Sequence, residues 1–133
     1  MTAGTLYLLP VALGDVAWTD FLPQRTRDVA CDLRYFIVEN AKTARAELKR
    51  LEHPTPLREL QIEELPQLPT PAQLEQLLAP VAAGNDAGLM SEAGCPGVAD
   101  PGALVVRRAH EGGLRVGPLV GPPSLLLALM ASG

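Results

Sequence analysis

The sequence predicts an α/β fold in which a parallel-rich sheet of about five strands is flanked by helices. Short apolar runs alternate with stretches of helical periodicity, which is typical of strand–helix–strand crossover units. The length of 133 residues suits one compact domain that buries its own core. Hydrophobic residues make up 47% and charged residues 20% of the chain, which excludes a wholly disordered protein.

The first half of the chain contains three expected strands and two expected helices. Aromatic and β-branched residues make the second strand the strongest of them, whereas Pro23 limits the first helix to a short, weak pattern. In chain order, we expect a strand at Thr5–Leu9, a helix at Thr26–Leu33, a strand at Tyr35–Val38, a helix at Ala41–Leu51 and a short strand at Leu60–Leu65.

The second half continues the alternation, and its helices carry start and stop signals. Thr70-Pro71 and Asp100-Pro101 each pair a capping residue with a proline, and Gly84 and Gly112-Gly113 are expected helix ends. These signals predict a helix from Thr70-Pro71 to about Ala83, a strand at Ala87–Met90, a helix from Asp100-Pro101 to Gly112-Gly113, a strand at Leu114–Val120 and a helix at Leu125–Ala131.

Composition excludes several classes of protein. A net charge of −4 and an aromatic content of 4% argue against a broad basic surface or a base-stacking platform for nucleic acid. The two cysteines, Cys31 and Cys95, form no metal-binding pattern with His53 or His110, so no metal is expected. We expect a soluble, cytoplasmic protein, because no secretory signal is present and glycines and prolines interrupt the uncharged stretch 116–133.

Candidate chemistry lies in three loops rich in glycine and proline. They follow expected strands, and parallel sheets bind ligands at the carboxyl ends of their strands. The loops are Pro10–Asp15, Ser91–Gly102 and Gly121–Ser124. Glycine allows close approach of the backbone to a ligand, and proline sets the loop conformation in advance. Neither a Walker phosphate loop nor a GxGxxG motif is present.

The segment Ser91–Gly102, S-E-A-G-C-P-G-V-A-D-P-G, resembles the S-D-A-G-T-P-G-I-S-D-P-G signature of tetrapyrrole methylase-like, S-adenosylmethionine-dependent methyltransferases. The chain is most similar to the branch that contains the small-subunit rRNA 2′-O-methyltransferase I. Gly4–Leu8 with Pro10 resembles the first strand of that branch, and Leu119–Pro122 followed by Leu125–Gly133 resembles its G-P-S helix. The resemblance therefore covers both ends of the chain.

The resemblance implies S-adenosylmethionine as cofactor and a homodimer, with this chain as the N-terminal cofactor-binding domain, residues 1–133. It also implies a second α/β domain after residue 133, so we expect a fragment of a longer protein. Methyl transfer is an in-line displacement governed by positioning and desolvation, so no catalytic side chain is assigned. The implied cofactor-binding residues are Pro10, Gly14, Ser91, Glu92, Ala93, Gly94, Cys95, Pro96, Gly121, Pro122, Pro123 and Ser124.

The chain departs from the branch in the same loops. Glu92, Cys95 and Pro123 stand where the family has Asp, Thr and Ser, which indicates a divergent paralogous group. After the second strand, residues 39–45 replace the family's E-D-T-R-x-T-R with E-N-A-K-T-A-R. Glu39, Lys42 and Arg45 remain candidate substrate contacts. Glu39 could equally cap the next helix, and the basic face that Lys42 and Arg45 share with Lys49 and Arg50 could simply be solvated.

The methyl acceptor stays open at this point. An RNA ribose 2′-hydroxyl is the leading hypothesis, and a tetrapyrrole or another small molecule is the alternative. A non-catalytic cofactor-binding or dimerisation module would also explain the departures at Glu92, Cys95 and Pro123. A doubly wound domain that binds another nucleotide is a further rival, which competition between adenosylhomocysteine and NAD or ATP would test.

Overall fold

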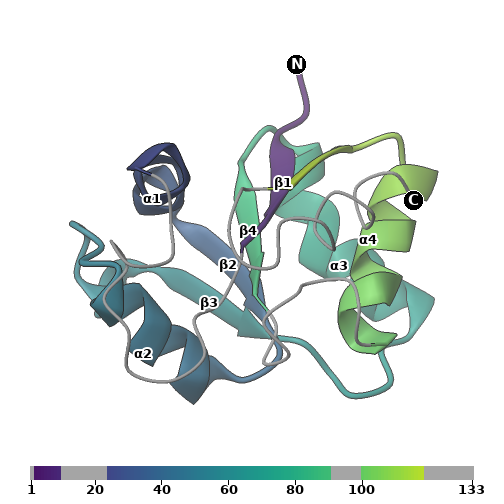
Figure 1. Ribbon diagram of the computed structural model, residues 1–133. Coiled ribbons are helices and arrows are strands. Elements are labelled where there is room, and N and C mark those ends of the chain that lie inside the picture. Colours follow the sequence, from purple (N-terminus) through teal and green to yellow (C-terminus); the bar gives the residue numbers. More distant parts are fainter. Residues whose placement is uncertain (1, 10–23, 91–99, 119–133) are drawn as a thin grey trace.

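The computed structural model describes residues 2–9, 24–90 and 100–118, which build a three-layer α/β domain (Figure 1). Five parallel strands form one sheet in the order β3-β2-β4-β1-β5, so the predicted fold class is confirmed. The strands are β1 (Thr5–Leu8), β2 (Tyr35–Val38), β3 (Gln61–Glu64), β4 (Ala87–Met90) and β5 (Arg115–Pro118). The helices are α1 (Gln24–Asp32), α2 (Ala41–Arg50), α3 (Pro71–Ala82) and α4 (Asp100–Glu111), with a 3₁₀ turn, η2, at Leu57–Glu59.

Helices cover both faces of the sheet. Connections that lead toward β3 and connections that lead toward β5 place their helices on opposite faces, because each crossover is right-handed. Helices α1 and α2 lie on one face and α3 and α4 on the other (Figure 1). Alternate side chains of β2 therefore enter two separate cores: Phe36 and Val38 pack toward α1 and α2, and Tyr35 and Ile37 toward α3 and α4. Burial on both faces explains why β2 is a continuous apolar run rather than an alternating one.

Helix α3 shows how local sequence sets element boundaries. Thr70 accepts a hydrogen bond from the backbone N–H of Gln73, whose side chain accepts one from the Thr70 N–H, and Pro71 occupies the first turn. At the other end, Gly84 adopts φ +113°, a conformation that L side chains rarely adopt. The expected start and stop of this helix are both confirmed.

Small differences from the expected boundaries occur elsewhere. Helix α1 begins at Gln24, two residues before the expected start at Thr26. Its burial of Thr26, Ala30 and Cys31 against the sheet supports a helix that its sequence pattern indicates only weakly. Helix α4 begins at Asp100 itself rather than after it, a one-residue difference typical of helix ends. The expected helix at Leu125–Ala131 lies outside the described residues.

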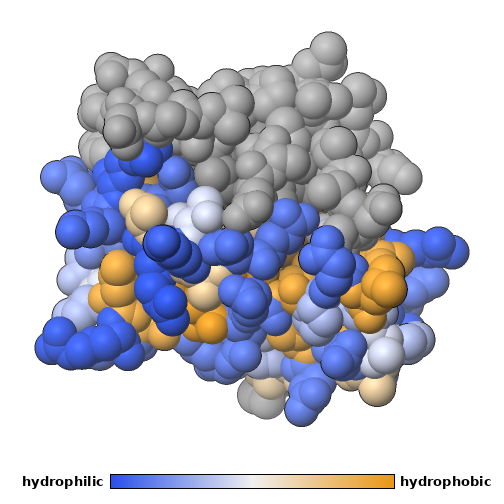
Figure 2. Space-filling model, turned by 90° about the horizontal axis from the view of Figure 1, so that it is seen from below, coloured by the Kyte–Doolittle hydropathy of each residue, from blue (hydrophilic) through white to orange (hydrophobic). Residues whose placement is uncertain are grey.

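No helix among the described residues is long and apolar enough to cross a bilayer. Figure 2 shows the side toward which β2, β3 and β4 point in Figure 1. Over the described residues this side is mainly hydrophilic, with smaller hydrophobic areas between the charged and polar groups. The carboxyl edge of the sheet is therefore bordered by a polar surface.

Candidate functional site

Three neighbouring strands end where the sequence predicts cofactor loops. Strands β4, β1 and β5 are adjacent and parallel, and their described ends are Met90, Leu9 and Pro118. The N–H of Leu9 donates to the carbonyl of Leu89 over 3.0 Å, so β1 and β4 remain paired up to that edge. Segments 10–23, 91–99 and 119–133, distant in sequence, therefore connect to the sheet side by side.

The predicted cofactor-binding residues themselves lie outside the described part of the chain, so their positions stay predictions. They are Pro10, Gly14, Ser91, Glu92, Ala93, Gly94, Cys95, Pro96, Gly121, Pro122, Pro123 and Ser124.

The pair β1 and β4 also forms a topological switch point. The chain after β1 leads to α1 on one face of the sheet, and the chain after β4 leads to α4 on the other. In open α/β sheets, such divergence leaves a crevice outside the carboxyl ends of the two strands, where ligands bind. The strand topology and the composition of the loops therefore both indicate a ligand site at the carboxyl ends of β1 and β4.

Glu39 borders this edge from β2. Its N–H donates to the carbonyl of Met90 over 3.2 Å, directly before segment 91–99, and its Oε1 atom is buried. The residue that caps α2 is its neighbour Asn40, whose side-chain oxygen accepts from the Thr43 N–H over 3.0 Å. The interpretation of Glu39 as the cap is therefore wrong, and its role as a substrate contact stays a prediction.

Glu64, at the end of β3, is a residue that sequence reasoning missed. Its Oε2 atom accepts a hydrogen bond of 2.8 Å from the backbone N–H of Ala41, in the first turn of α2. Because a carboxylate already occupies this positive helix end, together with the Asn40 cap, the α2 N-terminus is not an open phosphate site. The sequence signal that could have indicated this contact is an acidic residue at the carboxyl end of β3, the strand that pairs with β2.

Basic side chains line the solvent face of α2. Lys42, Arg45 and Lys49 are all exposed and follow each other at helical spacing, and we call these three residues the basic stripe. None of them makes an ion pair with any other described residue. Arg50, expected on the same face, instead lies 3.0 Å from the buried Glu47 carboxylate, so that expectation is corrected. The stripe starts beside the carboxyl edge of the sheet.

Comparison with known proteins supplies the remaining evidence. The chain is 30% identical over 132 residues to a ribosomal RNA small subunit methyltransferase I from Xylella fastidiosa, covering 99% of this chain and 45% of that protein. A protein of the same name from Leptospira biflexa is 32% identical over 130 residues, covering 98% of this chain and 51% of its own. One from Escherichia coli O157:H7 is 46% identical over 59 residues, which cover 44% of this chain and 21% of that protein.

The chain is homologous to the N-terminal part of ribosomal RNA small subunit methyltransferase I. The resemblance to the tetrapyrrole methylase family is thereby confirmed. This homologue spans about half the length of the relatives it matches. No protein-family model matches it.

His53 and Cys31 of this methyltransferase I homologue have structural roles. His53 Nδ1 accepts a hydrogen bond of 3.1 Å from the Thr55 N–H, and its Nε2 lies 2.9 Å from the Leu33 carbonyl oxygen. The imidazole also meets Phe36 edge-on at 6.1 Å. Cys31 is buried, and this burial raises the pKa of its thiol, so it behaves as a core residue as expected. Within the described ranges, no group of residues could hold a metal ion.

Proposed function

We propose that this chain is the cofactor-binding part of an S-adenosylmethionine-dependent methyltransferase that acts on an RNA ribose 2′-hydroxyl. The observation that carries the proposal is the adjacency of β4, β1 and β5. It places the starting points of all three predicted cofactor segments at one edge of the sheet, beside a topological switch point. The homologues named ribosomal RNA small subunit methyltransferase I support the reaction and the acceptor class.

The proposed chemistry fits a site without a protein nucleophile. The cofactor supplies an activated methyl group on a positively charged sulfur, and the protein positions it in line with the acceptor oxygen while excluding water. Backbone groups of Ala93, Gly94 and Cys95 hold the cofactor, and Glu92 favours the sulfonium charge. Glu39, held against the end of β4, lies beside the start of this segment and contacts the acceptor.

The basic stripe holds the RNA. It provides three exposed cations, none of them ion-paired with another described residue, on a helix that starts beside the carboxyl edge of a protein whose net charge is −4. Because Glu64 and Asn40 occupy the N-terminus of α2, side chains rather than helix N–H groups contact phosphate there. The few cations on this one helix face then set the orientation of the RNA rather than a high affinity.

The decisive test is a calorimetric titration of S-adenosylhomocysteine. It is carried out with this chain and with a chimera in which the chain replaces the matching N-terminal part of the Xylella protein. We expect the chimera to bind with micromolar affinity, whether or not the chain alone does. Gly94→Val in the chimera should lower this affinity more than tenfold. The matched control is Gly112→Ala, at the amino edge of the sheet, where the new Cβ has ordinary contacts of 3.5 Å or more.

Transfer of a labelled methyl group from the cofactor to small-subunit rRNA by the chimera tests the acceptor. No binding by either protein would refute the cofactor assignment, and displacement by NAD or ATP would indicate another nucleotide site. Cofactor binding with methyl transfer only to small molecules would refute the RNA acceptor. Cofactor binding without any transfer would favour a non-catalytic module.

A further inference from the structure

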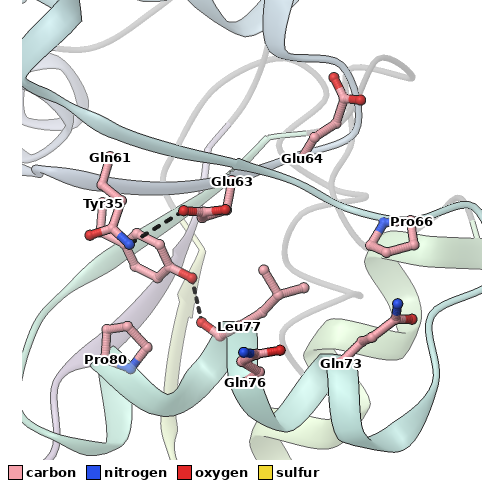
Figure 3. A pocket seen from close by; sticks show the side chains of 9 residues that line it. All are labelled: Tyr35, Gln61, Glu63, Glu64, Pro66, Gln73, Gln76, Leu77 and Pro80. Atoms are coloured by element: carbon pink, nitrogen blue, oxygen red, sulfur yellow. Dashed lines mark hydrogen bonds between the residues drawn. The ribbon is translucent and has the colours of Figure 1, made fainter.

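A pocket of about 410 Å³ lies at the β3 edge of the sheet, between β3, β2 and α3 (Figure 3). Strand β3 is at the opposite end of the sheet from β5, and two strands separate it from β1. The pocket is therefore distinct from the switch point between β1 and β4. Its lining residues are Tyr35, Gln61, Glu63, Glu64, Pro66, Gln73, Gln76, Leu77 and Pro80.

The pocket has an apolar wall and a polar rim. The Tyr35 hydroxyl donates to the Leu77 carbonyl over 2.5 Å, which fixes the phenol ring beside Leu77 and Pro80. Glu63 and Gln61 project from β3 opposite this wall, with Gln61 Nε2 3.5 Å from Glu63 Oε1.

Charge in the pocket has one sign. None of the nine lining residues is basic. Glu64 points away from the others in Figure 3, toward the Ala41 N–H that it accepts from. Gln73 uses its side-chain oxygen on the Thr70 N–H, which leaves its amide nitrogen as a neutral group. Glu63 is thus the carboxylate that faces the apolar wall, so the pocket is complementary to a cation with an apolar stem.

The backbone edge beside the pocket is open in the described part of the chain. Strand β3 pairs only with β2, through the N–H groups of Gln61 and Leu65, which donate to the Arg34 and Val38 carbonyls over 2.9 and 2.6 Å. Because amide directions alternate along a strand, the N–H and C=O groups of Ile62 and Glu64 face away from β2. These groups match the hydrogen bonds that an added strand would make.

We propose that an extended peptide with a basic residue docks here as a sixth strand beside β3. Its backbone pairs with Ile62 and Glu64, and one arginine or lysine side chain enters the pocket. The aliphatic stem packs against Leu77, Pro80 and the Tyr35 ring, and the cationic head meets the Glu63 carboxylate. Charge complementarity selects a basic peptide over other partners.

The test uses acetyl-Val-Thr-Arg-Thr-Val-amide and the same peptide with norleucine in place of arginine. Each is titrated into the ¹⁵N-labelled chain, and amide chemical shifts give the affinity. We expect shifts at the Ile62 and Glu64 amides and an affinity about fivefold higher for the arginine peptide, the size of a partly solvated charge-assisted contact. Glu63→Gln should weaken the arginine peptide about fivefold and leave the norleucine peptide unchanged.

Matched controls separate this docking from general electrostatics. Glu59→Gln removes the same charge from the exposed η2 turn outside the pocket and should leave both affinities unchanged. Glu63 is exposed, so its substitution leaves the core intact. Equal affinities for the two peptides, equal effects of Glu63→Gln and Glu59→Gln, or no β3 shifts at millimolar peptide would each overturn the proposal. In that case the charged side chains of β3 would only protect a free sheet edge.

Discussion

The basic stripe on α2 gives the sharpest prediction about RNA binding. Replacing Lys42, Arg45 and Lys49 together by alanine should lower the salt dependence of RNA affinity rather than the stability of the fold. Lys42 and Lys49 are seven residues apart, about 10 Å along the helix, so the three residues act within one Debye length at about 0.1 M salt. Each phosphate contact contributes about −0.7 to the slope of log K against log salt for single strands, so the slope should become about 2 units less steep.

Fluorescence anisotropy of a labelled small-subunit rRNA oligonucleotide, measured between about 50 and 200 mM salt, gives this slope. Alanine is the best helix former, so α2 should persist in the variant. The control is the triple alanine variant of Arg58, Arg107 and Arg115, which removes the same charge away from the stripe. An unchanged slope in the stripe variant, or an equal change in the control, would show that the stripe is a solvated helix face.

Three further predictions concern stability. Gly4→Ala should lower the free energy of unfolding by about 1–3 kcal/mol in urea denaturation, because its Cβ would overlap the backbone carbonyl of Asn85; unchanged stability would show that this backbone can shift at little cost. Asn40→Ala should cost about 1 kcal/mol by removing the cap of α2, and Asn40→Ser should restore most of it. Burial, and secondarily the charge of Glu63, raises the pKa of Tyr35 to about 12. Because the folded state favours the neutral phenol, the raised pKa of Tyr35 adds at most about 2–3 kcal/mol to the free energy of unfolding. This contribution is complete below about pH 10 and is lost as the pH rises toward 12. Urea midpoints should fall less over this window in Tyr35→Phe than in the wild type, and parallel curves would contradict the shift.

Local signals explain which elements were predictable. The run Tyr35–Val38 is apolar and β-branched throughout, so its strand assignment did not depend on its neighbours. Helix α3 carries its own capping box and terminal glycine, and both boundaries follow from them. Helix α1 has neither signal. Contacts such as the hydrogen bond of 3.1 Å from Arg27 Nε to the Leu51 carbonyl help to hold it, and these join segments that are distant in sequence.

The candidate site shows the same division. The sequence identified the three loops and the basic residues of α2, because glycine, proline and charge patterns are visible within a few residues. It predicted neither the binding of Glu64 to the α2 N-terminus nor the pairing of Arg50 with Glu47. The Glu64 contact joins two segments that lie 23 positions apart, which only the tertiary structure brings together. The Arg50–Glu47 pair lies within one helix at i,i+3 spacing, so helical periodicity could have indicated it.

The α/β class and the alternation of strands and helices follow from the amino-acid sequence alone. So does the resemblance to a methyltransferase family, which homologous proteins confirm. The strand order β3-β2-β4-β1-β5, in contrast, emerges only in the folded domain. That order makes β1 and β4 neighbours with diverging connections, and it leaves β3 as an open edge beside a pocket. Short-range propensities specify where a strand begins and ends, whereas its neighbours in the sheet depend on the burial and hydrogen bonding of the whole chain.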